Sequence, residues 1–130
     1  MPTGAPMAIF DRWSVVAVPF PCMEGDRVQR RPAVVVSEPI LARRHGLYWV
    51  VMVTSAENPR WPDDVAVSDL ALAGLPRSSV IRPAKIATIQ QDRVVRRLGE
   101  LALADRRAVR GAMKTLLGKG RGKDRPGTPG

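Results

Sequence analysis

The chain has 130 residues, the length of one domain, and 45% of them are hydrophobic, which is enough to form a core. One cysteine and one histidine exclude an internal disulfide, a cysteine-based metal site and a histidine-pair metal site, and they argue against a Ser-His-Asp triad. The formal net charge of +9 favours a polyanionic partner such as nucleic acid, although arginine is also a common way to solvate a surface.

Residues 1–9 contain proline, glycine and methionine, and we expect them to form a flexible leader before a domain at residues 10–118. The N-terminus lacks the basic segment and the long apolar segment of a signal peptide. No apolar run approaches the roughly 18 residues of a membrane span. The sequence therefore predicts a cytoplasmic protein with a reduced cysteine.

Two β-branched, apolar stretches predict the first strands of the domain. Residues 13–18 (WSVVAV) should form a buried strand that ends at Pro19 and Pro21, because proline has no N–H to donate to a sheet. After a polar turn, residues 31–36 predict a second strand. Pro32 places the start of this strand at a sheet edge or a strand end.

A third strand is predicted at residues 47–53 (LYWVVMV), the most apolar stretch of the chain, and Trp49 within it is expected to lie in the core. Between the second and third strands, residues 39–46 predict a short helical turn or a loop. The segment after the third strand, residues 56–64, is polar and rich in turn formers, and Trp61 is its one large apolar residue.

Short strands continue in the second half of the domain. Residues 65–67 predict a short strand and residues 73–79 a turn. Residues 79–82 and 85–89 then predict two strands that Pro83 separates. Several short strands with glycine and proline between them indicate a mainly β fold, a small barrel or sandwich.

The period of the apolar residues changes to that of a helix at the C-terminal end. Four apolar residues recur at intervals of three and four: Val109, Met113, Leu116 and Leu117. Asp105 falls in the first turn, where the helix dipole favours a carboxylate, and Gly118 is suited to end the helix. Residues 119–130 are expected to be a disordered basic tail. They hold four basic residues and one acidic residue, which leaves a charge of +6 for residues 1–118.

Two blocks carry side chains suited to binding an anion. The block RRPAVVVS (residues 30–37) begins with two arginines, and the block VVMVTS (residues 50–55) ends with Thr54 and Ser55. If these strands are neighbours, the Arg31 guanidinium and the Thr54 hydroxyl can meet at one phosphate of a nucleic acid. Alternatively, the two hydroxyls only satisfy backbone groups at the end of a strand.

These blocks, with DRWSVVAVPFP, LPRSSVIRPAKIATI and the closing helix, resemble the MazF/PemK (Kid-like) toxins of type II toxin–antitoxin modules over about residues 10–118. The resemblance implies a small SH3-like β-barrel of the CcdB/PemK type with a C-terminal helix. It also implies a homodimer that cleaves single-stranded mRNA without a metal or other cofactor. An antitoxin protein whose acidic segment occupies the RNA groove would inhibit it.

The resemblance assigns Arg31, Thr54 and Arg82 as catalytic residues. In this family the 2′-OH of the RNA is the nucleophile, and the products are a cyclic phosphate and a 5′-hydroxyl. A guanidinium binds two phosphate oxygens at once, so Arg31 would bind the phosphate and stabilise its developing charge, and Thr54 would bind a phosphoryl oxygen or orient Arg31. Further RNA contacts are assigned to four residues: Arg30, Ser55, Lys85 and Glu24.

One position departs from the family pattern. PemK-like members often carry an Arg-x-Asp-Gln block, and the matching stretch here is Arg82, Pro83, Ala84 and Lys85, so alanine replaces the aspartate. Glu24 or Asp26 in the first loop could supply the missing carboxylate, or they could simply form a turn around Gly25.

Two alternatives to an active nuclease therefore stay open. The chain could be a catalytically weak or silent relative that binds RNA, an antitoxin or, like the CcdB gyrase poisons, another protein. It could also be a basic SH3-like module that binds nucleic acid without cleaving it. Only 5% of the residues are aromatic, which argues against an extended base-stacking surface, although Trp61 could stack on one base.

Overall fold

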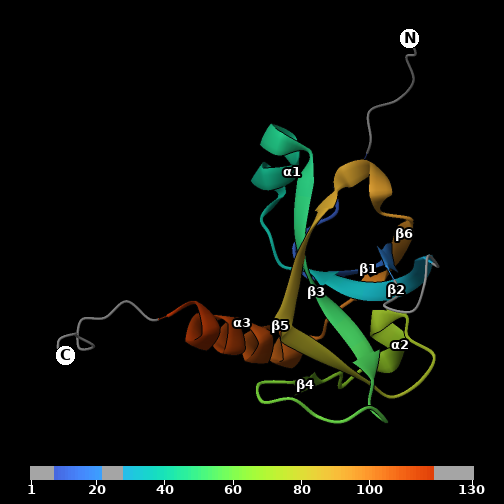
Figure 1. Cartoon of the computed structure of the whole chain (residues 1–130), viewed down its shortest axis with the longest axis vertical. Coiled ribbons are helices and arrows are strands. Elements are labelled where there is room, and N and C mark those ends of the chain that lie inside the picture. Colours follow the sequence, from blue (N-terminus) through green and yellow to red (C-terminus); the bar gives the residue numbers. More distant parts are fainter. Residues whose placement is uncertain (1–7, 22–27, 119–130) are drawn as a thin grey trace, which may run out of the picture.

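The computed structural model describes residues 8–21 and 28–118, and these form one curled antiparallel sheet with helices on both faces (Figure 1). The order of strands across the sheet is β4-β5-β3-β2-β1-β6. The strands are β1 (Ser14–Pro21), β2 (Val28–Val35), β3 (Leu47–Ser55), β4 (Val65–Ala66), β5 (Ser79–Gln90) and β6 (Arg96–Glu100). The helices are α1 (Pro39–His45), α2 (Leu70–Ala73), the 3-10 turn η1 (Gln91–Arg93) and α3 (Leu103–Leu117). The predicted mainly β fold with a closing helix is confirmed, and the sheet curls into a half-barrel.

Each face of the sheet carries its own apolar cluster. One cluster includes Val51 of β3 and packs against Ala73 of α2 and Val109 of α3. The other includes Val50 of β3 and packs against Ala42 of α1. Successive residues of a strand point to opposite faces, so the continuous apolar run of β3 can serve both clusters.

Pro19 does not end β1, contrary to the sequence prediction; the strand continues to Pro21, its last residue. The carbonyl of Ala17 accepts a hydrogen bond from Val95 N at 2.8 Å, on the side of β6. Pro19 and Pro21 have the same orientation as Ala17, because residues two apart in a strand face the same neighbour. Among the described residues, the pairing of β1 with β6 stops at Ala17, so neither proline has to donate a hydrogen bond.

Pro83 also fails to divide the region into two strands. Val51 pairs with Ile86 and the next residue, Met52, pairs with Arg82, so residues 83–85 form a bulge within the single strand β5. A bulge removes these residues from the ladder, and the missing N–H of Pro83 is therefore tolerated.

The sequence gives little sign of two further elements. Strand β6 has the sequence RRLGE, in which one large apolar residue is surrounded by charge, and α2 is a single turn that Asp69 caps by accepting from Leu72 N at 3.0 Å. The predicted closing helix is confirmed as α3, and Gly118 follows it with a φ of 90°. Asp105 is buried in its first turn and accepts hydrogen bonds from the backbone N–H and the hydroxyl of Ser68.

The contact between α2 and β6 depends on glycine. Gly74 ends α2 with a φ of 72°, and a Cβ built there would overlap the carbonyl oxygen of Leu98. We expect Gly74→Ala to lower the free energy of unfolding by about 2–4 kcal/mol, because left-handed strain and a backbone clash add together. Gly46→Ala is the matched control: its φ is 66°, nothing lies near its Cβ, and it should cost only about 1 kcal/mol. Urea denaturation measures both, and equal losses would contradict the clash.

Candidate nucleic-acid interface

Strands β2 and β3 separate beside the two residues that the sequence singles out. Their ladder ends at the pair Ala33 and Met52, and Figure 1 shows the strands running apart beyond it. Val36 N donates to the Trp49 carbonyl at 2.9 Å, so alternate residues of this segment direct their N–H groups toward β3. By the same alternation the nitrogen of Pro32 faces β3. Because proline has no N–H to donate, the ladder ends there. We call this point of separation, flanked by residues 31 and 54, the β2–β3 fork.

Arg31 and Thr54 project from the same face of the fork. Arg31 precedes Ala33 by two residues and Thr54 follows Met52 by two, so both share the face of that pair. Both residues are half-buried. Arg31 Nη2 donates to Gln29 Oε1 at 3.3 Å, and Thr54 Oγ1 accepts from Asn58 Nδ2 at 2.6 Å. A guanidinium has five N–H donors and an accepting hydroxyl keeps its own proton, so both groups retain donors for an anion.

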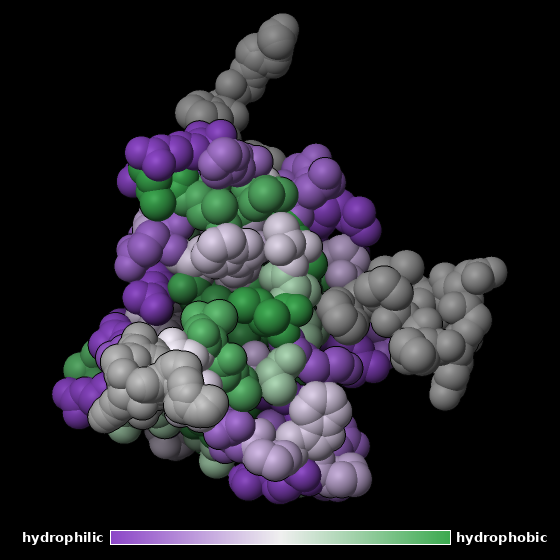
Figure 2. All heavy atoms as spheres, turned by 60° about the vertical axis from the view of Figure 1, so that its left-hand side comes forward, coloured by the Kyte–Doolittle hydropathy of each residue, from purple (hydrophilic) through white to green (hydrophobic). Residues whose placement is uncertain are grey.

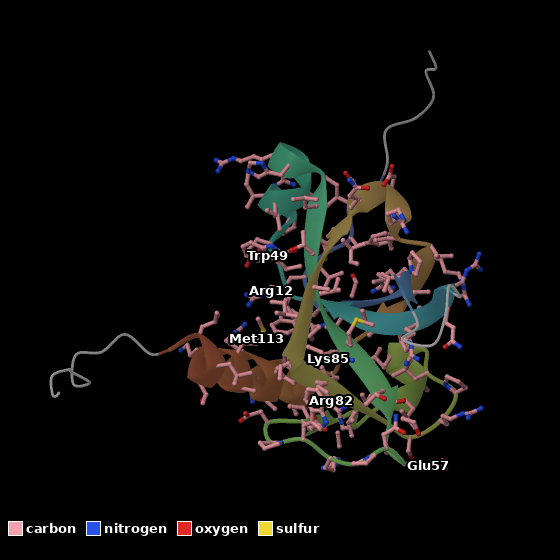
Figure 3. All side chains as sticks on the ribbon, viewed as in Figure 1. Arg12, Trp49, Glu57, Arg82, Lys85 and Met113 are labelled. Atoms are coloured by element: carbon pink, nitrogen blue, oxygen red, sulfur yellow. The ribbon has the colours of Figure 1, made fainter. Side chains whose placement is uncertain are left out.

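The other residues predicted to bind RNA lie in different places. Arg30 is exposed, but strand alternation directs it to the opposite face from Arg31. Ser55 Oγ accepts from Glu57 N at 3.1 Å and stabilises the turn after β3. Lys85 is exposed in the β5 bulge, a short distance along the strand from Arg82 (Figure 3). Glu24, like Asp26, lies outside the described residues.

Arg82 is buried in an ion pair. The residue is 7% exposed, and its Nε and Nη2 atoms donate to the two carboxylate oxygens of Asp64 at 3.0 and 2.9 Å. Nη2 also donates to the Pro59 carbonyl at 2.9 Å. The guanidinium carbon lies 4.2 Å from the centre of the Trp61 ring. The head group of Arg82 thus holds three residues of the segment 56–64 against β5.

Asp64 is ionised in this arrangement over the ordinary pH range. Burial by itself would raise the pKa of the carboxyl, but the opposing effects are larger in sum. These are the hydrogen bond from Arg82, the hydrogen bond from Trp61 N, and the positive charges of Arg82 and Arg60. The pKa of Asp64 is therefore lowered. The pair is a neutral unit in which the charge of Arg82 is already compensated.

Sequence reasoning missed Asp64 as the partner of Arg82. The family spacing leads to Ala84, and the nearest other carboxylates suggested by the sequence are in the first loop. The partner comes instead from the residue before β4, because the pairing of Val65 with Ile81 brings Asp64 beside Arg82. The only available signal was the run of two aspartates at the end of a turn-rich segment.

An apolar groove lies on the other face of the sheet, between α3 and strands β3 and β5. It has a volume of about 450 Å³, and its lining includes Arg12, Trp49, Ile86, Thr88, Met113 and Leu117. Trp49 is 47% exposed, so its predicted place in the core is wrong; it lines this groove with Met113 and Leu117 of α3. Figure 2 shows hydrophobic side chains gathered on this side of the molecule within a hydrophilic border. We call this surface the α3 groove.

The part of the chain that the structure describes contains neither a candidate metal site nor a candidate membrane-spanning helix. No group of three or more His, Cys, Asp or Glu side chains is arranged to hold a metal ion. No helix in residues 8–21 and 28–118 is long and apolar enough to cross a bilayer.

Comparisons with known proteins identify the fold. The chain resembles the MazE-MazF complex from Deinococcus radiodurans with 25% identity and a TM-score of 0.69, over 88% of this chain and 100% of the other. It resembles an endoribonuclease in complex with its cognate antitoxin from a mycobacterial species with 22% identity and a TM-score of 0.66, over 88% and 99% of the two chains. No curated protein sequence matches it. A family model described as PemK-like, MazF-like toxin of type II toxin-antitoxin system matches residues 11–117, and the chain belongs to that family.

Proposed function

We propose that this protein is an endoribonuclease that cleaves single-stranded mRNA at the β2–β3 fork without a metal ion. Family membership supports the reaction class. The observation that carries the assignment to this chain is the arrangement of the fork, where Arg31 and Thr54 share one face beside a broken ladder. The cytoplasmic location expected from the sequence belongs to the same proposal, because mRNA is the substrate.

The proposed chemistry uses the 2′-OH of the RNA as the nucleophile. Its oxygen bonds to the adjacent phosphorus, the bond to the 5′-oxygen breaks, and the products are a cyclic phosphate and a 5′-hydroxyl. Arg31 would bind two phosphoryl oxygens and stabilise the charge that develops on them. Thr54 would donate its hydroxyl proton in a hydrogen bond to one of these oxygens. Arg31 is a poor proton acceptor, so another group must take the proton of the 2′-OH, for which Glu24 and Asp26 are the candidate carboxylates; the departing 5′-oxygen takes up a proton from water.

The structure gives Arg82 a different part in this proposal from the catalytic role expected by resemblance. In the described state its donors are directed at Asp64 and Pro59. Binding a phosphate would require that ion pair to open. We therefore propose that Arg82 is a positioning residue, which holds segment 56–64 in place beside Thr54.

End-group analysis of cleaved RNA tests the function. Purified protein is incubated with a mixed-sequence, single-stranded RNA in EDTA, and the fragments are treated with polynucleotide kinase with or without prior phosphatase. We expect cleavage in EDTA with 5′-hydroxyl ends that the kinase labels directly. Loss of cleavage in EDTA, or 5′-phosphate ends, would contradict the proposal.

A catalytically silent, RNA- or antitoxin-binding protein is the second candidate. Two observations favour it: Ala84 replaces the family carboxylate, and Arg82 is neutralised by Asp64. The same incubation distinguishes the two candidates, because a silent protein would leave the RNA uncut.

We also propose that the protein is a homodimer and that an antitoxin is its protein partner. The family and the two complexes that this chain resembles support an antitoxin. The α3 groove supports the dimer, since Trp49, Ile86 and Leu117 are 47%, 51% and 78% exposed on one surface. Clustered apolar area of this kind marks a protein interface.

Trp49→Glu is expected to convert the dimer to a monomer, because it places a charge in the centre of the apolar surface. Light scattering at micromolar concentration measures the mass. Val95→Glu is the matched control: Val95 is also an exposed apolar residue, at 39%, but it lies beside β6 outside the α3 groove. A monomeric wild-type protein, or a Trp49→Glu variant that stays dimeric, would contradict this interface.

A further inference from the structure

Trp61 is an exposed residue whose aromatic ring packs against a buried cation. The Arg82 guanidinium lies 4.2 Å from the ring centre on one face, and the residue is still 42% exposed. Because one face is covered, the exposed area belongs to the other face and the edges. An ordinary exposed tryptophan on a loop has no such support.

The backbone around Trp61 is fixed at several points. Trp61 N donates to Asp64 Oδ2 at 2.9 Å, and Asp64 N donates to the Trp61 carbonyl at 3.2 Å. Arg82 adds its bonds to Asp64 and to the Pro59 carbonyl. Two prolines, at 59 and 62, restrict the chain on either side of the tryptophan. The ring is therefore pre-organised, and a ligand that stacks on it does not have to order the loop.

The residue on which the Trp61 ring packs lies on a strand close to the β2–β3 fork. Arg82 is opposite Met52 in the sheet, and Met52 is also the last β3 residue in the ladder with β2. The backbone of Arg82 thus lies about two strand spacings, on the order of 10 Å, from β2 at the end of that ladder, and Trp61 packs on the Arg82 guanidinium. Figure 3 shows Arg82 and Lys85 along β5. Lys85 is exposed and lies in the bulge opposite Val51 and Met52 of β3.

The charges near the ring are mixed, and Arg60 is the one suited to contact a phosphate. Arg60 is exposed and close enough to lower the pKa of Asp64, so a cation stands beside the ring. Glu57 and Asp63 are the exposed carboxylates of segment 56–64. The positive charge of Arg82 does not repel Arg60 strongly, because Asp64 neutralises it.

We propose that Trp61, stacked on Arg82, is a platform for one base of the bound single-stranded RNA, and that it helps to determine where the RNA is positioned. The proposal rests on the proposed function and adds a base-contacting residue to it. Any base has a π-face, so stacking itself tolerates sequence variation, and the platform fixes the position of one nucleotide relative to the fork. Arg60 would contact an adjacent phosphate.

An abasic scan tests the platform without depending on cleavage. The probe is a short 2′-O-methyl oligonucleotide, taken from a mixed pool by filter retention on the wild-type protein, with each base removed in turn. For wild-type protein, one abasic position should weaken binding by roughly five-fold to a hundred-fold, the range of base–aromatic stacking. Trp61→Ala should weaken binding of the intact probe by a similar factor and should be insensitive to the abasic site at that position.

Two further variants separate stacking from loss of structure. Trp61→Phe keeps an aromatic face and should restore most of the affinity and the abasic sensitivity. Arg60→Ala should weaken binding of every probe equally and leave the abasic pattern unchanged, as a phosphate contact does. An abasic sensitivity that persists in Trp61→Ala, or a uniform loss that Trp61→Phe does not restore, would overturn the platform. If the wild type retains no RNA from the pool, the proposed function fails as well.

Discussion

Arg31→Ala is expected to reduce RNA cleavage by about a hundred-fold to a thousand-fold, the effect of removing one preorganised donor from a developing oxyanion. Arg31→Lys should also be damaging, since an ammonium is a point charge and cannot bind two phosphoryl oxygens as a planar guanidinium does. Thr54→Ala removes the second donor of the fork and should also strongly reduce the rate of RNA cleavage. Single-turnover cleavage of a mixed-sequence RNA in EDTA measures all three.

The control for Arg31→Ala must remove one positive charge from a site away from the fork. Arg107 is exposed on α3 and suits this purpose, so Arg107→Ala should cleave at close to the wild-type rate. Circular dichroism and thermal unfolding check that the Arg31 and Thr54 variants are folded. A folded Arg31→Ala variant that cleaves at the wild-type rate would remove the fork from the mechanism.

Asp64→Ala is expected to lower the free energy of unfolding by about 3–5 kcal/mol, because it leaves the Arg82 guanidinium buried without its counter-charge. The side chains of Arg82 and Asp64 are only 9% and 1% exposed, so water cannot readily replace the lost partner. Replacing both residues, Arg82→Met with Asp64→Leu, should recover most of the loss. Urea denaturation measures the series.

Asp63→Asn is the control for this ion pair, since Asp63 is exposed and asparagine tolerates its positive φ of 73°. It should change stability by less than about 0.5 kcal/mol. The pH dependence gives a second test. Because the pKa of Asp64 is lowered in the folded state from 3.8, its contribution is fully present above about pH 4 and is lost as the pH falls through the folded pKa. Asp64→Asn should lack that acid-dependent loss, and an unchanged acid profile would contradict the role of the pair.

The sequence predicted most of the architecture because its apolar residues carry clear periods. The continuous apolar run of β3 and the helical spacing of Val109 and Met113 both correspond to observed elements. Proline was misread in β1 and β5 because a proline is excluded only where its nitrogen faces a hydrogen-bonding partner. Which edge a nitrogen faces depends on the order of strands, and no local pattern encodes that order. Strand β6 was missed for a related reason, since it forms by pairing with β1 and not by its own composition.

In the candidate site, too, some residues could be predicted from the sequence and others could not. The pairing of β2 with β3 brings Arg31 and Thr54 to one face, as two conspicuous sequence blocks had indicated. Trp61, Asp64 and Arg82 come together through the pairing of β4 with β5, which places residues 18 positions apart in contact. The composition of β3 alone indicates burial of Trp49, whereas the structure leaves it 47% exposed in the α3 groove.

The most direct test of the central claim compares two versions of one RNA pool, unmodified and fully 2′-O-methylated, with wild-type and Arg31→Ala protein. Wild-type protein should bind both pools but cut only the one that has free 2′-hydroxyls, and the products should end in a cyclic phosphate. Arg31→Ala should cut neither at an appreciable rate. Cleavage of the methylated pool, or equal rates for the two proteins on the unmodified pool, would mean that the phosphate is processed by other residues or by another route.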